Sequence, residues 1–314
     1  MKQFSDSARA ELAHLRTSQS CCAHAELAGI LRVAGSLHLH GLSTLSLTVG
    51  TEHADVARKI ILLLRQAASI PADVVVEEHK QPRHQRIYMV RLDPGQAVRD
   101  LLVELGALGR DGQLLKTLSN SLLHKQCCRT SFLRGAYMMR GSVCDPRGNG
   151  YHLEIVVGTL ELAQGLRRVL GQVHLKSNCM ERKGQHVVYI KDADDIAVFL
   201  TTIGAQAARL ELEEVRVLKE IRGGVNRLVN AETANVDKTV IAAMEQVAWI
   251  EALAAKGAMD RLPDTLRDLA RTRLENPEAS LRELGQLLPK PASKSAVNHR
   301  FRRLKKYVEA ILNG

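Results

Sequence analysis

The basic residues near the C-terminus form the group whose chemistry is easiest to name. Positions 290–306 hold seven Lys or Arg residues and no Asp or Glu. Lysine and arginine bind phosphate oxygens, and arginine and asparagine also pair with base edges in the DNA major groove. We therefore expect a surface that binds double-stranded DNA. The residues expected to form it are Ser293, Lys294, Ser295, Asn298, His299, Arg300, Arg302, Arg303, Lys305 and Lys306.

Two predicted helices would position these residues. Apolar residues that recur every three or four positions over 294–312 predict a helix with one packed and one polar face, with Ser293 as its N-cap. Another short helix is predicted over 281–288, and the Pro-Lys-Pro segment that follows prevents a continuous helix. This pair predicts a helix-turn-helix. A basic amphipathic helix could instead bind a membrane or face water, but the short neighbouring helix and the Asn and His on the polar face favour DNA.

The remainder of the chain contains an internal duplication. Residues 21–36 and 127–142 align without gaps, and six of the 16 pairs are identical. Each copy continues with a strand signal, a helix, a second strand signal and a helix, so that each half reads helix, strands, helix, strands, helix. Gly29 and Gly135 occupy matching positions inside the predicted helices, which indicates that two backbones approach closely there. Gly35 and Gly141 are expected to end those helices as left-handed C′ residues.

These patterns predict an α+β fold. The expected N-terminal domain is a duplicated αββαββα unit with pseudo-twofold symmetry, made of residues 1–108 and 109–205. Residues 206–257 carry helical periodicity alone, with an interruption near 230–235, and predict a helical connector. The all-α helix-turn-helix domain would then occupy residues 258–314.

The segment LAGILRVAGS, residues 27–36, resembles the LAGLIDADG motif of homing endonucleases, and LRGAYMMRGS, residues 133–142, is a more diverged copy. The resemblance implies paired helices beneath two β-saddles that lie along DNA. It also implies an acidic residue before the last glycine of each motif as a ligand for a divalent metal. Those positions are Ala34 and Arg140 here. We therefore expect no catalytic residue, no metal site and no cofactor, because a hard cation needs carboxylate oxygens.

The duplicated region, the connector sequence beginning GGVNRLVNAETANVDK and the SKSAVNHRFRRL segment together resemble the WhiA family of bacterial regulators, over nearly the whole chain. The resemblance implies a transcriptional regulator involved in sporulation, cell division or chromosome segregation. RNA polymerase or another regulator is implied as a further partner. The residues themselves support only a DNA-binding protein without catalysis.

Two basic loops in the duplicated region are secondary candidates. The segments 79–86 and 180–186 occupy corresponding positions between strands, and a saddle would hold them near a duplex. The same surface could bind protein, or the loops could simply be solvated hairpin tips. The residues concerned are Lys80, Arg83, Arg86, Arg182 and Lys183.

Composition restricts the remaining classes. The 314 residues are 45% hydrophobic and 25% charged, as in globular domains. Lys and Arg outnumber Asp and Glu by ten, which favours an anionic partner. The longest aliphatic run, residues 60–64, is too short to span a bilayer, so we expect a cytoplasmic, nucleoid-associated protein with no membrane partner. The six cysteines include no CxxC pair, and we expect reduced, buried thiols rather than a zinc knuckle.

Two alternatives stay open. The first is an active nuclease or RNA maturase of the LAGLIDADG class that uses carboxylates outside the motifs. The second is an adaptor that mainly binds another protein, such as the transcription machinery. Cleavage of DNA in the presence of Mg²⁺ or Mn²⁺ would identify the first, and function that survives neutralisation of the last helix would identify the second.

Overall fold

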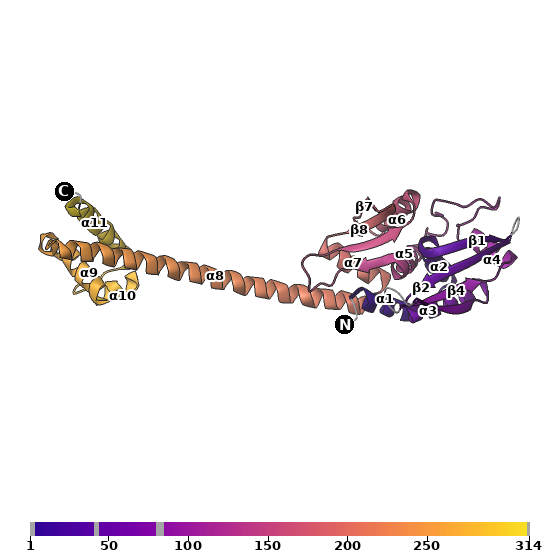
Figure 1. The fold of residues 1–314 in the computed structure, drawn as a ribbon, viewed down its shortest axis with the longest axis horizontal. Coiled ribbons are helices and arrows are strands. Elements are labelled where there is room, and N and C mark those ends of the chain that lie inside the picture. The colour runs from indigo at the N-terminus through magenta and orange to yellow at the C-terminus, as the bar shows by residue number, and fades with distance from the viewer. Residues whose placement is uncertain (1–3, 41–43, 80–84, 313–314) are drawn as a thin grey trace. The chain divides into compact units, whose positions relative to one another are not determined.

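The computed structural model describes residues 4–40, 44–79 and 85–312. The chain divides into two compact units, Met1–Leu218 and Lys219–Gly314. Figure 1 traces both, from the indigo N-terminus to the yellow C-terminus. The division falls inside the long helix α8 (Gln206–Ala255), and each unit is described by itself. The four-part division at residues 108, 205 and 257 stays a prediction.

The first unit contains two copies of the predicted order of helices and strands. The elements of the first copy are α2 (Ser20–Ala34), β1 (Gly35–His40), β2 (Thr44–Thr51), α3 (Ala54–Ala68), β3 (Asp73–His79), β4 (Gln85–Leu92) and α4 (Gln96–Glu104). The elements of the second copy are α5 (Gln126–Arg140), β5 (Gly141–Val143), β6 (Leu153–Val157), α6 (Leu160–Gln172), β7 (Asn178–Arg182), β8 (Gln185–Ile190) and α7 (Ala193–Ile203).

Each copy forms a four-stranded antiparallel sheet. The strand orders are equivalent, β1-β2-β4-β3 and β5-β6-β8-β7. Alternate residues of the inner strands face the core, because successive side chains of a strand point to opposite faces. In β2, Leu47 and Val49 are buried and pair with Leu92 and Val90 of β4. This shared topology confirms the predicted duplicated α+β fold.

The helices α2 and α5 pack against each other at the centre of the first unit, and their glycines allow the contact. A Cβ atom on Gly29 would lie 2.2 Å from the carbonyl oxygen of Phe132, and one on Gly135 would lie 2.1 Å from that of Glu26. Positions 26 and 132 are equivalent in the duplication, so the two contacts are reciprocal. The close approach predicted from the mid-helix glycines is therefore confirmed.

The predicted role of Gly35 and Gly141 was wrong. Their φ angles are −72° and −85°, so both are extended and begin β1 and β5 directly. The chain passes from helix to strand without a left-handed turn. Glycine is still required, because a Cβ atom would lie 2.6 Å from the carbonyl oxygen of Leu31 at the first position and 2.3 Å from the ring of Tyr137 at the second.

A helix outside the duplication completes the first unit. The helix α1 (Phe4–His14) buries Phe4, Ala8 and Leu12, a spacing of four residues that sequence analysis did not use. Its Ser5 hydroxyl donates to the carbonyl of Val143 at 2.8 Å and accepts from the Val143 amide at 2.7 Å. The helix α1 is thereby hydrogen-bonded to the end of β5.

The connector segment contains no interruption. The helix α8 continues through residues 230–235, where a break was expected. That segment, NAETAN, holds neither Pro nor Gly. Relative to alanine, each asparagine destabilises a helix interior by well under 1 kcal/mol, much less than a proline does. The helix therefore absorbs this cost, and the prediction overestimated the effect of two asparagines.

The second unit is all-helical. The C-terminal part of α8 packs with η1 (Met259–Arg261), α9 (Asp264–Glu275), α10 (Leu281–Leu287) and α11 (Lys294–Leu312). Its core contains Ile250 and Leu253 of α8, Leu266 of α9, Leu284 of α10 and Phe301 of α11, all buried. The predicted helix bounds of 281–288 and 294–312 agree with the structure to within one residue.

Candidate nucleic-acid interface

A short turn joins α10 to α11. The helix α10 begins with a capping box, in which the Glu283 amide donates to the Ser280 hydroxyl and the Ser280 amide donates to the Glu283 carboxylate. After α10, the Ala292 amide donates to the Gly285 carbonyl at 2.8 Å. A Cβ atom on Gly285 would lie 2.2 Å from the Ala292 carbonyl oxygen, so this turn requires glycine. The close turn sets the angle at which α11 leaves α10.

The helix α11 begins as predicted. Ser293 accepts a hydrogen bond from the Ala296 amide at 3.3 Å, which makes it the N-cap. The apolar side chains Val297, Phe301, Leu304 and Val308 are each at most 3% exposed. These four residues pack against the core of the second unit. The residues on the other side of α11 are exposed to solvent. One helix thus holds the core together and presents a polar surface.

The structure places the ten predicted DNA-binding residues on or beside that open side. Arg300 is half-buried, and the other nine are exposed. The exposed set consists of Ser293, Lys294, Ser295, Asn298, His299, Arg302, Arg303, Lys305 and Lys306.

The charge of this surface is not neutralised within the described part of the chain. The ion pairs shown there include none of the Lys or Arg residues of α11. Lys305 does have a neighbour, since its Nζ lies 4.9 Å from the centre of the Trp249 ring of α8. Cations without carboxylate partners attract phosphates more strongly than cations in ion pairs, because there is no intramolecular contact to break.

A buried arginine supports the helix from behind. Arg273 of α9 is 1% exposed. Its guanidinium donates to Gln246 Oε1 of α8 at 3.1 Å and to the Ala279 carbonyl at 2.6 Å, and it lies 5.5 Å from the Phe301 ring centre. Burial lowers the pKa of Arg273. This one side chain connects α8, the loop before α10 and α11, so it fixes the surface that α11 presents.

The secondary candidate arginines differ from the cations of α11, because both described ones form ion pairs with glutamates. Arg86 of β4 is paired with Glu78 at 3.0 Å, and Arg182 of β7 is paired with Glu154 at 3.0 Å. Burial acts against ionisation of Glu154, but the hydrogen bonds from Arg182 and His152 lower its pKa overall. Lys183 lies in the turn between β7 and β8 with a φ of 54°. Lys80 and Arg83 lie outside the described residues.

The residues at the C-terminal ends of α2 and α5 do not fit a divalent metal. Ala34 is half-buried and Arg140 is exposed. Arg9 of α1 donates to the Gly141 carbonyl at 2.7 Å, and the Asp6 carboxylate is held by Arg9 at 2.8 Å. Asp145, which follows shortly after α5, is paired with Arg147 at 3.3 Å. This end of the helix pair presents guanidinium groups where a metal needs carboxylates.

At the opposite end of the same helices, four cysteines come together, which sequence analysis missed. The Sγ atoms of Cys21, Cys22, Cys127 and Cys128 all lie within 4.8 Å of one another. The signal was present in the duplication, because both copies begin with a Cys-Cys pair. All six thiols are free, as expected.

The expectation that the cysteines are buried was only partly correct. Cys22 and Cys128 are buried, and desolvation raises the pKa of Cys22 to about 11 and that of Cys128 to about 12. Cys127 and Cys144 are exposed. Cys127, the second residue of α5, is exposed although its Sγ belongs to the cluster.

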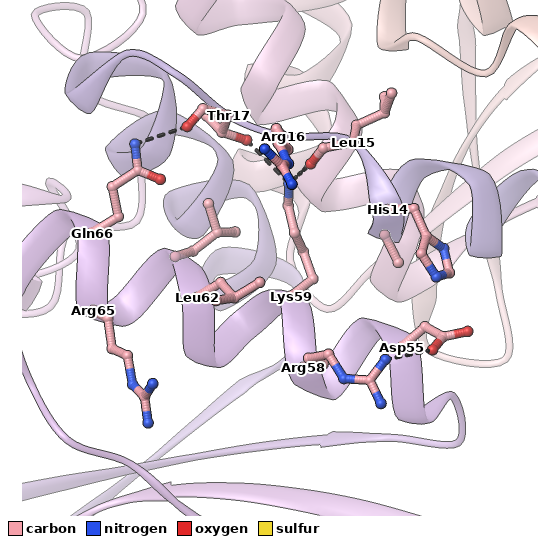
Figure 2. A pocket seen from close by; sticks show the side chains of 12 residues that line it. His14, Leu15, Arg16, Thr17, Asp55, Arg58, Lys59, Leu62, Arg65 and Gln66 are labelled. Atoms are coloured by element: carbon pink, nitrogen blue, oxygen red, sulfur yellow. Dashed lines mark hydrogen bonds and ion pairs between the residues drawn. The ribbon is translucent and has the colours of Figure 1, made fainter.

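A cavity of about 690 Å³ lies between α3 and the segment that joins α1 to α2. Figure 2 shows how α3 holds this segment: Lys59 reaches the Leu15 carbonyl and Gln66 donates to the Thr17 carbonyl at 2.8 Å. Lys59 Nζ also lies 3.3 Å from the buried Glu26 carboxylate. These polar groups satisfy the backbone of the segment, so we interpret the cavity as structural.

Comparison with known proteins identifies the family. Family models match residues 20–108 as the WhiA N-terminal LAGLIDADG-like domain, 129–222 as the WhiA LAGLIDADG-like domain and 225–308 as the WhiA C-terminal HTH domain. A curated relative from Desulfitobacterium hafniense (strain Y51), named probable cell division protein WhiA, is 42% identical over 308 residues, which cover 98% of this chain and 96% of the relative. The chain belongs to the WhiA family.

Other WhiA proteins agree. The relative of the same name from Heliobacterium modesticaldum is 41% identical over 98% of this chain and 96% of its own. The crystal structure of full-length DUF199/WhiA from Thermatoga maritima matches with a TM-score of 0.61 and 25% identity, over 98% of this chain and 99% of that chain. These matches confirm the predicted family and fold, including the LAGLIDADG-like and helix-turn-helix parts. No helix among the described residues has the length and hydropathy to cross a membrane.

Proposed function

We propose that this chain is a sequence-specific DNA-binding transcriptional regulator without catalytic activity. The observation that carries the proposal is the exposed side of α11, where Asn298 and Arg302 lie among cations that form no ion pair with any carboxylate in the described part of the chain. In this proposal α11 enters the major groove, Asn298 and Arg302 contact bases, and Lys294, Arg303, Lys305 and Lys306 contact phosphates. The capped N-terminus of α11 adds its dipole near a phosphate.

The absence of nuclease activity is supported by the helix ends. Arg140 at one metal-ligand position and Ala34 at the other leave no carboxylate pair there, and Asp6 and Asp145 are held by arginines. In this proposal the duplicated unit is a scaffold that adds affinity, orientation or a partner surface. The ion pairs of Arg86 and Arg182 make it a weaker phosphate-binding surface than α11.

The cellular role is proposed from the relatives. They carry the name probable cell division protein WhiA. We infer that this chain regulates genes of cell division, with chromosome segregation and sporulation as related processes, and that it acts at the nucleoid. RNA polymerase or another regulator would be its protein partner.

Protein binding by the first unit is a second candidate, favoured by one observation. The edge strand β3 exposes Val74, Val75 and Val76 by 40%, 37% and 48%. Exposed apolar side chains on an edge strand favour a protein partner over DNA. If this surface carries the function, simultaneous replacement of Arg302, Arg303, Lys305 and Lys306 by alanine would leave regulation intact.

The decisive experiment selects bound duplexes from a random pool with the full-length chain and then measures affinity for the enriched sequence. We expect Asn298→Ala and Arg302→Ala each to weaken specific binding by about 1–3 kcal/mol, because each removes a base contact. Arg58→Ala is the matched control, since it removes one exposed positive charge from α3, where Arg58 pairs with Asp55. No enriched sequence, or equal affinity of all four proteins, would contradict the proposal.

A further inference from the structure

The four clustered thiols lie where the two halves of the duplicated unit meet. Cys21 and Cys22 are in the first turn of α2, and Cys127 and Cys128 are in the first turn of α5. The packing of the two helices brings their first turns together, at the end opposite Ala34 and Arg140. We propose that Cys21, Cys22, Cys127 and Cys128 form a tetrahedral site for one zinc ion that links the two halves.

The distances favour a single ion. Tetrahedral Zn²⁺ with Zn–S bonds of about 2.3 Å requires sulfur atoms about 3.8 Å apart. The four Sγ atoms lie within 4.8 Å of one another, so shifts of each sulfur by less than about 1 Å would complete the tetrahedron. A cubane iron–sulfur cluster is larger than a single ion, so its four cysteine sulfurs lie farther apart than those around one zinc. Four soft thiolates also match zinc better than magnesium or calcium.

Two helix N-termini and a nearby arginine favour thiolates, whereas the burial of Cys22 and Cys128 opposes them. Neither α2 nor α5 has a side-chain cap at its N-terminus, so the amides of both first turns and the positive ends of both helix dipoles lie beside the sulfurs. Arg16 lines the cavity that adjoins Cys22 and Cys127. A zinc ion with four thiolates carries a net charge of −2, and these groups offset it. The ion in turn compensates the burial of Cys22 and Cys128, which is unfavourable for bare thiolates.

The site has an entry path and polar neighbours. The adjoining cavity has a volume of about 520 Å³ and reaches Cys127, which is exposed. The Cys21 and Cys22 thiols donate to Gln19 Oε1 at 3.7 Å and 3.6 Å. Once the thiols are deprotonated and bound to the ion, rotation of this amide would turn its NH₂ group toward the sulfurs. An ion can therefore reach the cluster without separation of the helices.

The proposed role is structural. The ion would bind both halves through side chains whose positions depend on the α2–α5 contact, so it would stabilise the folded state and leave DNA recognition to α11. Removal of the ion by a strong chelator should lower the midpoint of thermal unfolding, because binding to the folded state alone stabilises it.

The test uses the full-length chain, purified under reducing conditions without chelator. We expect one zinc ion per chain by elemental analysis. After exchange for Co²⁺, we expect the intense visible and near-ultraviolet absorption of a tetrahedral cobalt thiolate. Cys127→Ser should weaken zinc affinity by about 100-fold or more in competition with a chromophoric chelator. The control is Cys144→Ser, which removes an exposed cysteine outside the cluster and should leave the zinc content and the zinc affinity unchanged. Because Cys127 is exposed, its variant should keep the circular dichroism of the parent.

Several results would overturn the proposal. One is no zinc in the purified protein and no cobalt-thiolate absorption after addition of Co²⁺. Iron with inorganic sulfide in place of zinc would show a cluster instead of a single ion. Disulfides between the Cys21–Cys22 and Cys127–Cys128 pairs in protein purified without oxygen would show a redox pair. Equal loss of metal in Cys127→Ser and Cys144→Ser would place the ion elsewhere.

Discussion

At the residue scale, a buried charge cluster holds together the centre of the first unit. The Glu26 side chain is fully buried and accepts from Arg134 at 3.1 Å and from Thr17 at 2.8 Å. Lys59, whose side chain is 4% exposed, lies 3.3 Å from the second carboxylate oxygen. A single carboxylate thus compensates two cations from two different helices, α3 and α5.

We predict that Glu26→Gln lowers the free energy of unfolding by about 3–5 kcal/mol, because it leaves two cations without a counter-charge in a buried site. Urea unfolding monitored by circular dichroism measures this. The control is Glu78→Gln, which breaks the exposed pair with Arg86 and should cost at most about 1 kcal/mol. Equal and small effects would show that the buried cations are solvated or rearranged.

A second prediction at this scale concerns Lys305. We expect Lys305→Ala to weaken DNA binding about equally for all sequences and to reduce the slope of log affinity against log salt by about 1, as for one lost phosphate contact. The contact with Trp249 adds a stability loss of about 0.5–1 kcal/mol. Salt titrations with specific and random duplexes separate the two effects. A change in sequence preference would instead assign Lys305 to base recognition.

At the scale of elements, the pairing of α2 with α5 decides how the two halves combine. The reciprocal contacts of Gly29 and Gly135 bring two helix backbones closer than any residue with a side chain allows. The same contact sets the position of the four cysteines at one end and of Ala34 and Arg140 at the other.

We predict that Gly135→Ala destabilises the chain by about 3 kcal/mol, because the added methyl group would force the two helices apart. The matched control is Gly171→Ala in α6, where a Cβ atom meets nothing within 4 Å. That substitution should change stability by less than about 1 kcal/mol, in the stabilising direction. Thermal unfolding of both variants checks the difference, and similar midpoints would contradict the close-contact argument.

At the scale of the whole molecule, the duplicated unit has a LAGLIDADG-like fold, and the proposal is that it does not cut DNA. We predict that the full-length chain does not cleave supercoiled DNA in the presence of Mg²⁺ or Mn²⁺. Gel electrophoresis of the plasmid after incubation is sufficient. Metal-dependent cleavage that remains with the protein through successive purification steps, and that disappears on denaturation, would overturn the proposal of a non-catalytic scaffold.

Local sequence was enough for much of the architecture. The duplication, the order of strands and helices, the seam of α11 and its Ser293 cap follow from periodicity and capping residues, which act over a few positions. Predictions from local sequence failed at two places, the connector helix and the glycines that follow α2 and α5. Two asparagines did not interrupt α8. Gly35 and Gly141 occur in both copies because a side chain would not fit beside Leu31 and Tyr137, and neither glycine forms a left-handed turn.

The amino-acid sequence by itself therefore determined the order of elements within the two copies, the family and the polar side of α11, because each depends on spacing along one segment. Tertiary structure alone decided which distant residues meet: Glu26 with Lys59 and Arg134, Arg273 with Gln246, and the two Cys-Cys pairs with each other. Such contacts depend on the register in which helices pack. That register follows from the fit of whole surfaces, including two glycines that allow α2 and α5 to touch, and no single segment encodes it.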